Sequence, residues 1–231
     1  MGGRLPLEPA FQSACPDCPA ARQDVFAELV GVAKGDCAFH CPAVEPRSPV
    51  PERWFETYGL GLVRRGVLIR QRVDPQGRAS AIDAAGPGCV FPLRDWRGPS
   101  SASGYAATRL LVCLLPQDRL ETSLTDRQDS ALDLVRLQSE AMERLERITE
   151  ARGRSSAESR VAALMCALAD TLSPPRNRDR ITGLQQRDIA ALLSMRHETV
   201  CRVLGNLEAK GAVTRSSDGL RIADRSVLEA V

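Results

Sequence analysis

The sequence predicts an α+β protein in which an antiparallel β-roll, one long helix and a helix-turn-helix with a small β-hairpin follow one another along the chain. Short alternating runs between glycine turns occupy residues 60–88, a pattern typical of antiparallel strands. Residues 129–150 contain no glycine or proline and are rich in helix formers. Two short helical patterns then meet at a tight turn within residues 186–207.

Length and composition limit the class of protein. The chain has 231 residues, of which 43% are hydrophobic, enough for one or two cores. No apolar run reaches the roughly 18 residues that a membrane span requires. The start of the chain, residues 1–9, is short and broken by prolines, unlike a secretory leader. We therefore expect a cytoplasmic protein without a membrane span. We also expect no enzyme, because the two histidines have no nucleophile beside them.

The β-roll is predicted from strands and turns that alternate between residues 60 and 88. Strand patterns at 60–66 and 67–73 meet at an Arg-Gly turn, a polar turn follows at 74–77, and another strand covers 79–82 before a Gly-Pro-Gly sequence.

The long helix carries an apolar stripe with alternating spacings of four and three. These positions are Leu134, Gln138, Ala141, Leu145 and Ile148. Such a stripe, flanked by charged residues, is typical of a coiled-coil seam and predicts a homodimer. The alternative is a helix that packs only on its own domain. A serine cap within 155–158 then precedes a helix over 159–172, and Ser-Pro-Pro ends it.

The two short helices near the C-terminus have apolar faces that predict packing across a corner. Ile189, Ala190 and Leu193 form the first face, Ser194 suits the turn, and a second apolar face continues over 200–207. The polar residues of the second helix share an outward face that fits a DNA major groove. They are His197, Glu198, Cys201 and Arg202. Although the net charge is only +2, arginine dominates after residue 151, as phosphate contacts require.

At these residues the chain resembles the Crp/Fnr family of bacterial transcription regulators, whose recognition helix carries a Glu and an Arg one turn apart. Glu198 and Arg202 match that pair, whereas His197 and Cys201 depart from the family's usual neighbours. The alternating runs at 210–215 and 219–222 resemble the family's wing. The resemblance implies a homodimer that binds palindromic promoter DNA and works with RNA polymerase. The DNA contacts it implies are Arg187, Arg196, His197, Glu198, Thr199, Cys201 and Arg202.

The β-roll pattern is similar to the effector domain of the same family, which divides the chain into four parts. These are an N-terminal cysteine-containing segment (1–30), a β-roll sensor domain (31–127), a dimerisation helix (128–150) and a winged helix-turn-helix domain (151–231). The cyclic-nucleotide branch of the family requires a Glu and an Arg-Ser pair in its phosphate loop. Residues 88–105 contain neither, so a cAMP sensor is disfavoured.

Cysteines gather in the first half of the chain. Six of the eight precede the long helix, and in a reducing compartment thiolate ligation is the first expectation. The Fnr branch implies an oxygen-labile [4Fe–4S] cluster held by three N-terminal cysteines and one in the last β-roll strand. Cys15, Cys18 and Cys113 match three of these ligands. The family spacing places the remaining ligand at Asp24, so the candidates are Cys37, favoured slightly, Cys41, Asp24 and Cys89.

Three other sensor chemistries stay open. Cys-Pro dipeptides and His40 suit haem, whereas Cys15, Cys18, Cys37 and Cys41 suit a structural zinc ion. A thiol switch at Cys201 would disturb base contact directly. In the leading hypothesis, cluster integrity biases the dimer helices, so that redox state sets promoter occupancy. The competing class is a nucleic-acid-packaging module without sequence preference.

Overall fold

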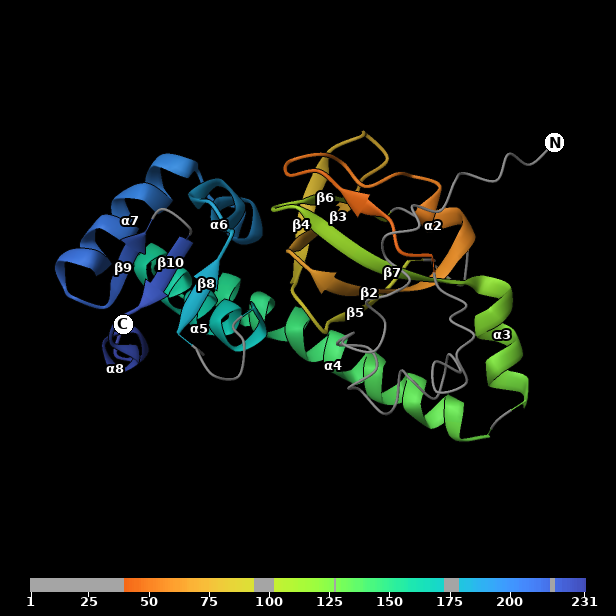
Figure 1. Cartoon of the computed structure of the whole chain (residues 1–231). Coiled ribbons are helices and arrows are strands. Elements are labelled where there is room, and N and C mark those ends of the chain that lie inside the picture. Colours follow the sequence, from red (N-terminus) through yellow and green to blue (C-terminus); the bar gives the residue numbers. More distant parts are fainter. Residues whose placement is uncertain (1–39, 94–101, 127, 173–178, 217–218) are drawn as a thin grey trace.

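The computed structural model describes residues 40–93, 102–126, 128–172, 179–216 and 219–231. Figure 1 shows a β-roll, a group of helices with a small sheet, and a long helix that runs from one to the other. This order confirms the predicted α+β class and the predicted succession of β-roll, long helix and helix-turn-helix. Among the described helices, none combines the length and the hydropathy that a membrane span requires.

The β-roll consists of two antiparallel sheets with the strand orders β1-β7-β2-β5 and β4-β3-β6. Their strands are β1 (Ala43–Val44), β2 (Tyr58–Arg65), β3 (Leu68–Val73), β4 (Ala79–Ala85), β5 (Val90–Pro92), β6 (Ala102–Ala106) and β7 (Leu110–Pro116), with a short helix α2 (Trp54–Thr57) before β2. Gly66 turns β2 into β3 with a φ of 84°, a backbone angle that glycine tolerates better than any other residue. The predicted Arg-Gly turn is therefore confirmed. Phe91 and Leu114 belong to the buried cluster between the sheets.

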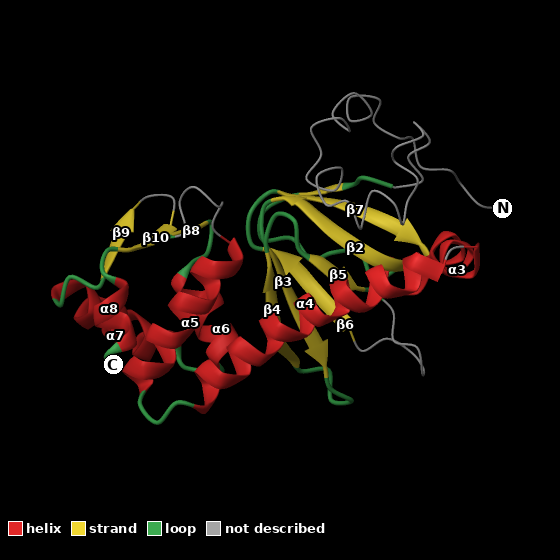
Figure 2. Ribbon diagram, turned by 90° about the horizontal axis from the view of Figure 1, so that it is seen from below, coloured by secondary structure: helices red, strands yellow, loops and turns green. Residues whose placement is uncertain are grey.

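Two helices follow the roll, α3 (Gln117–Asp126) and α4 (Gln128–Gly153), and Figure 2 shows α4 running along the underside of the sheets. The long helix predicted over 129–150 is thus confirmed and continues for three further residues. Its Leu137 shares a buried cluster with Leu60, Leu62 and Cys113 of the roll. Packing on its own domain therefore occupies one face of α4.

Part of the apolar stripe predicted as a dimer seam is buried against its own chain and is not exposed for contact with a second chain. This corrects the prediction. Ala141 and Ile148 are buried within their own chain. Three other apolar side chains of α4 are each 61% exposed: Leu132, Val135 and Met142. They are separated by three and seven residues, the spacing of a heptad stripe. Leu132, Val135 and Met142, here called the exposed stripe, are therefore the large apolar side chains that α4 leaves exposed in the single chain.

A buried charge cluster fixes α4 to the roll. Asp83 is fully buried, and its Oδ2 lies 3.3 Å from Arg70 Nη1 and 3.5 Å from Arg144 Nη2 of α4. Arg144 Nη2 also donates to the Val90 carbonyl at 2.8 Å. Burial lowers the pKa of Arg70, and the charge of Asp83 opposes that shift. One carboxylate thus compensates two nearly buried guanidinium groups.

The C-terminal part is helical apart from a small antiparallel sheet with the order β8-β10-β9. Its elements are α5 (Ala157–Leu172), β8 (Arg180–Thr182), α6 (Gln186–Leu193), α7 (His197–Ala209), β9 (Val213–Ser216), β10 (Gly219–Ile222) and α8 (Arg225–Glu229). The predicted hairpin is confirmed as β9 and β10. One hydrophobic cluster joins Met165 and Leu204 of this part to Ile69 and Ala81 of the roll. The two parts therefore share a core.

The serine cap predicted before α5 is present, with a different partner from the one the spacing suggested. Ser156 Oγ accepts from the Ser159 backbone N–H at 2.9 Å, and Ser159 Oγ accepts from the Ser156 N–H at 3.2 Å. This is a reciprocal capping box with serine at both ends. Glu158, the acidic residue of the predicted cap, instead accepts from Lys210 Nζ at 2.6 Å.

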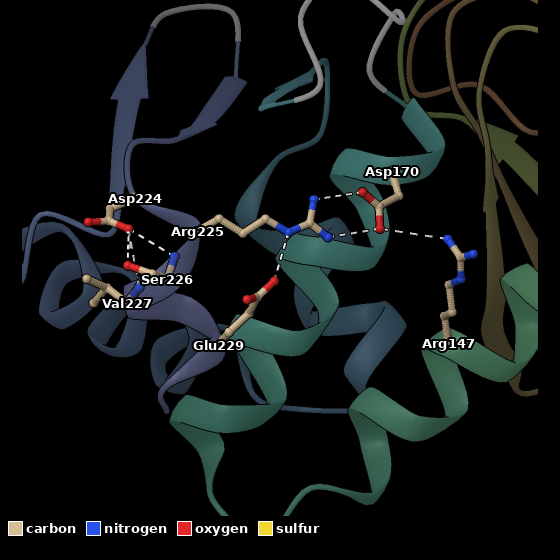
Figure 3. Close-up of polar contacts among 7 residues, drawn as sticks. All are labelled: Arg147, Asp170, Asp224, Arg225, Ser226, Val227 and Glu229. Atoms are coloured by element: carbon tan, nitrogen blue, oxygen red, sulfur yellow. Dashed lines mark hydrogen bonds and ion pairs between the residues drawn. The ribbon is translucent and has the colours of Figure 1, made fainter.

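An ion-pair network ties the last helix to the body of the protein, as Figure 3 shows. Arg225 donates from Nη1 and Nη2 to the two carboxylate oxygens of Asp170 at 2.8 and 3.0 Å. Arg147 of α4 lies 3.8 Å from the same carboxylate. Asp224 caps α8 by accepting from the Ser226 N–H at 2.9 Å. Asp170 on α5 therefore links the C-terminal helix to the long helix.

Candidate nucleic-acid interface

Helices α6 and α7 meet at a corner whose geometry the turn residue sets. α6 ends at Leu193, and its C-cap residue Ser194 has a φ of 54°, in the left-handed region. The Met195 N–H donates to the Ala190 carbonyl at 2.9 Å, closing the turn, and α7 begins at His197 after Arg196. The turn predicted at Ser194 is confirmed. Ile189 and Leu193 of α6 belong to the same buried core as Val200 and Leu204 of α7, which fixes the two helices relative to each other.

The solvent-facing side of α7 carries most of the residues predicted to contact DNA. Arg196, His197, Glu198 and Arg202 are exposed, and Thr199 is half-buried. Glu198 and Arg202 are four positions apart, so they lie on one helix face. No ion pair joins either of them to another described residue. Their charged ends are therefore available to a ligand.

Cys201 is half-buried rather than fully outward. Its thiol donates to Gln186 Oε1 of α6 at 2.7 Å and lies 3.4 Å from His197 Nε2. The contact links the second turn of α7 to the start of α6. Cys201 therefore adjoins the exposed face at its edge and also braces the corner.

A groove of about 700 Å³ opens between the start of α6, the start of α7 and the β9–β10 hairpin. Arg187 and His197 line it from the two helices, and Arg215 lines it from β9. Glu208 orients Arg215 by accepting a hydrogen bond from Arg215 Nε at 2.7 Å. Hydrogen bonds from the side chain and backbone of Arg215 lower the pKa of the Glu208 carboxyl. The groove thus brings basic side chains from three elements to one surface.

Asp188, on the first turn of α6, is a polar centre that was not predicted from the sequence. Its side chain is fully buried. Its Oδ2 accepts from the Gln185 N–H at 2.7 Å, and its Oδ1 accepts from Tyr105 Oη at 2.7 Å. Arg47 Nη1 lies 2.8 Å from each carboxylate oxygen. Burial and this carboxylate raise the pKa of Tyr105. The acidic residue three positions after Gln185 is a capping signal that sequence reasoning could have found.

Arg152, near the end of α4, forms a second contact between the β-roll and the helix-turn-helix. Arg152 Nε donates to the Leu192 carbonyl of α6 at 2.6 Å, and Arg152 Nη2 donates to the Ala81 carbonyl of β4. Together with Asp188, Arg152 holds the first helix of the corner against the β-roll. The orientation of α7 therefore depends on residues of both parts.

Two of the predicted metal-ligating cysteines come together in the roll. Cys41 Sγ lies 3.4 Å from Cys113 Sγ on β7. The hydrogen bond from Cys113 lowers the pKa of the Cys41 thiol to about 7, against the effect of burial, and the charge of Arg64 assists. Cys15, Cys18, Cys37 and Asp24 lie outside the described residues. Cys89 packs against a different hydrophobic cluster, and burial raises its pKa.

The distance between the two sulfurs limits the group that they can hold together. Ligands about 2.3 Å from one tetrahedral zinc ion lie about 3.8 Å apart, close to the observed separation. The four cysteines of a [4Fe–4S] cluster bind four different irons, so their sulfurs stand farther apart. The pair therefore does not fit two corners of such a cluster. Within the described residues no group of three or more His, Cys, Asp or Glu could hold a metal ion.

The remaining candidate for haem is already hydrogen-bonded. His40 Nδ1 lies 2.7 Å from Tyr58 Oη, and the two rings are tilted against each other. The histidine next to Cys41 therefore has a partner at Nδ1, the kind of hydrogen bond that a metal-ligating histidine commonly makes through its second ring nitrogen.

Comparison with known proteins agrees with this geometry. Residues 159–231 match the family described as the Crp-like helix-turn-helix domain. No curated protein matches the chain in sequence.

Among solved structures, FixK2 from Bradyrhizobium japonicum is similar with a TM-score of 0.70 and 19% identity, covering 83% of this chain and 96% of that one. TTHB099, a CRP-family transcriptional regulator from Thermus thermophilus, gives 0.63 and 19%, covering 82% and 95%. A CooA mutant from Carboxydothermus hydrogenoformans gives 0.63 and 18%, covering 87% and 89%. These likenesses show that the chain has the fold of Crp/Fnr regulators.

Proposed function

We propose that this protein is a homodimeric, sequence-specific DNA-binding transcription regulator that reads palindromic promoter DNA with α7. The observation that carries the proposal is the exposed pair Glu198 and Arg202, which a rigid helix corner presents on one face. A guanidinium donates two parallel hydrogen bonds to guanine, and a carboxylate accepts from the cytosine amino group. Similarity to the Crp-like helix-turn-helix domain supports the same assignment.

Contacts with the DNA backbone are assigned to the groove beside α7. Arg187, Arg215 and the start of α7 converge there, and phosphates bind both basic side chains and helix N-termini. Arg196 and Thr199 lie in the first turn of α7 or immediately before it. These residues would set the register of the protein on DNA, whereas Glu198 and Arg202 would distinguish bases.

Dimerisation is assigned to the exposed stripe of α4. Three apolar side chains at heptad spacing face solvent in the single chain, and a second α4 would cover them. A two-fold dimer places two recognition helices about one DNA turn, roughly 34 Å, apart. RNA polymerase is the further partner that such a promoter-bound regulator would meet.

Signal detection is assigned to the cysteines of the N-terminal half. A [4Fe–4S] cluster would use Cys113 or Cys41, but not both, together with Cys15, Cys18 and Cys37. When bound, such a cluster supplies an oxygen-labile link between the N-terminal segment and the roll. Haem, a structural zinc ion or a thiol switch at Cys201 are the alternatives. Iron, sulfide and zinc analysis of protein purified without oxygen separates them, and the iron content of Cys113→Ser tests that ligand.

DNA reading is tested by selecting bound sequences from a random duplex library and measuring affinity for the selected site by fluorescence anisotropy. Arg202→Ala is expected to weaken binding by about 1–3 kcal/mol and to relax the preference at one base pair. Arg119→Ala, an exposed arginine on α3, is the matched control and should bind normally. If no motif is enriched and binding depends only on salt, the packaging class is favoured instead.

A further inference from the structure

We propose that Cys41 and Cys113 are a two-electron oxidation site, at which peroxide converts the two thiols into a cross-strand disulfide. Both cysteines belong to the β-roll, and strand register brings them together. The segment before β1 continues to pair with β7, because His40 and Leu114 exchange two backbone hydrogen bonds of 3.1 and 2.8 Å.

The next position along the same register places the two cysteines opposite each other. The Val112 N–H donates to the Pro42 carbonyl at 3.3 Å. Pro42 has no N–H to return that bond. Cys41 and Cys113 therefore stand between two hydrogen-bonded positions, at a non-hydrogen-bonded position. Antiparallel residues there have Cα atoms about 4.5 Å apart. That separation lies within the range of about 4.4–6.8 Å that disulfides span.

The side chains already point toward each other. Their sulfurs are 3.4 Å apart, whereas a disulfide bond measures about 2.05 Å. Rotation of a cysteine side chain about its Cα–Cβ bond sweeps the sulfur through more than the remaining difference. Bond formation at this position therefore needs no change of strand pairing.

The two thiols differ in access, which assigns their roles. Cys41 is half-buried, whereas Cys113 is only 2% exposed. A small oxidant in solvent therefore reaches Cys41 first. Cys113 is then the resolving thiol, held in place by the strand register.

The chemistry balances with hydrogen peroxide as the oxidant. The Cys41 thiolate attacks one peroxide oxygen, the O–O bond breaks, and a sulfenic acid and hydroxide form. The Cys113 thiol then attacks the Cys41 sulfur, the S–O bond breaks, and water leaves with the thiol proton. The hydroxide takes up the proton that the Cys41 thiol released on ionising. Two thiols therefore lose two electrons in total, and one peroxide becomes two waters.

The cysteine pair lies next to residues of α3 and α4, so its oxidation would also affect elements outside the two strands. Cys113 belongs to the buried cluster that includes Leu137 of α4 and Leu120 of α3, and Cys41 packs against that cluster. A disulfide would join residues 72 positions apart and fix the chain before β1 to the strand that leads into α3 and α4.

The test uses the full-length protein, reduced, treated with a chelator and exposed to a small excess of hydrogen peroxide. Intact mass should fall by two hydrogen atoms. Tryptic digestion should then yield a disulfide-linked pair of peptides, 35–47 and 110–119. Because residues 35–47 contain both Cys37 and Cys41, fragmentation of the linked peptide or a Cys37→Ser variant must show that Cys41 is the bonded residue.

Variants provide the controls. Cys41→Ser and Cys113→Ser should abolish the linked peptide, whereas Cys166→Ser and Cys89→Ser should retain it. The oxidised protein should melt at a temperature about 5–15 °C higher than the reduced protein, because the cross-link restricts the unfolded chain. A Cys113 that stays open to alkylation after unfolding, or a Cys41 bonded to Cys37, would overturn the proposal. DNA affinity of the reduced protein enters none of these readouts, so failure here leaves the proposed function intact.

Discussion

Arg47 and Asp188 lie 141 residues apart in the sequence, and Arg47 Nη1 stands 2.8 Å from both carboxylate oxygens of Asp188. The arginine comes from the loop after β1, and the carboxylate belongs to the first turn of the helix that positions α7. Because Asp188 is fully buried, its carboxylate charge is compensated by hydrogen-bond donors within the protein, which are Arg47, Tyr105 Oη and the Gln185 N–H. The pair therefore couples the orientation of the helix-turn-helix to the β-roll.

Replacing the carboxylate should measure that coupling. Asp188→Asn removes the charge and places an amide donor among three donors, so we expect a loss of about 1–3 kcal/mol in the free energy of unfolding. Urea titration gives the loss, with the exposed Asp118→Asn as the control. Arg47→Ala should act in the same direction. If the losses in the double variant simply add, the two residues do not interact energetically.

The exposed stripe of α4 makes a second prediction. Met142→Glu places a charge at the centre of the proposed dimer interface and should convert the dimer to monomers at micromolar concentration, as measured by analytical ultracentrifugation. Thr122→Glu, an exposed position on α3, introduces the same charge elsewhere and should leave the dimer intact. A Met142→Glu protein that sediments as the wild type does would place the interface on another surface.

The exposed stripe of α4 illustrates which features of the structure can be predicted from the sequence and which cannot. The strand and turn pattern around Gly66, the corner at Ser194 and the long helix followed from local rules, because backbone angle and periodicity are local properties. The dimer seam could not be predicted from local rules. A repeat of three and four residues does not distinguish whether Ala141 and Ile148 face a second chain or their own domain. Gln138 and Leu145, two of the three half-buried members of that prediction, lie three positions after Val135 and Met142, so they border the exposed stripe.

Contacts between residues that are distant in the sequence could not be predicted either, because the predictive rules are local. Nothing near Arg47 signals Asp188, and the cysteine spacing alone could not choose which cysteine adjoins Cys113. Strand register makes that choice for Cys41. The assignment of Cys15, Cys18 and Cys37 stays a prediction, as do the DNA contacts on α7.

The Cys41 thiol makes a prediction about pH. Its pKa is lowered to about 7, so the thiolate predominates above pH 7 and gives way to the less reactive thiol below it. In reduced, chelator-treated protein, iodoacetamide should modify Cys41 with a rate that rises through pH 7. The hydrogen bond from Cys113 is the largest cause of the shift, so Cys113→Ala should move the rate profile to higher pH. Peptide-resolved mass spectrometry follows the reaction, and an unchanged midpoint in Cys113→Ala would contradict this cause.

The buried cluster at the other face of α4 makes the last prediction. Asp83 compensates two guanidinium groups, from Arg70 and Arg144, and its neutral analogue leaves both cations buried without a counter-charge. Asp83→Asn should therefore cost about 3–5 kcal/mol in the free energy of unfolding, the range measured when one partner of a buried ion pair is removed.

Asp133 offers the matched comparison on the same helix. It is also buried, at 7% exposure against 0% for Asp83, but its partner Arg136 keeps a side chain that is 69% exposed. Water can solvate that arginine once the carboxylate is gone, so Asp133→Asn should cost less than about 1 kcal/mol. Equal losses for the two variants would mean that the Asp83 cluster does not hold α4 to the roll. A larger loss for Asp83→Asn, accompanied by weaker dimerisation, would show that attachment of α4 to the roll also sets the geometry of the exposed stripe.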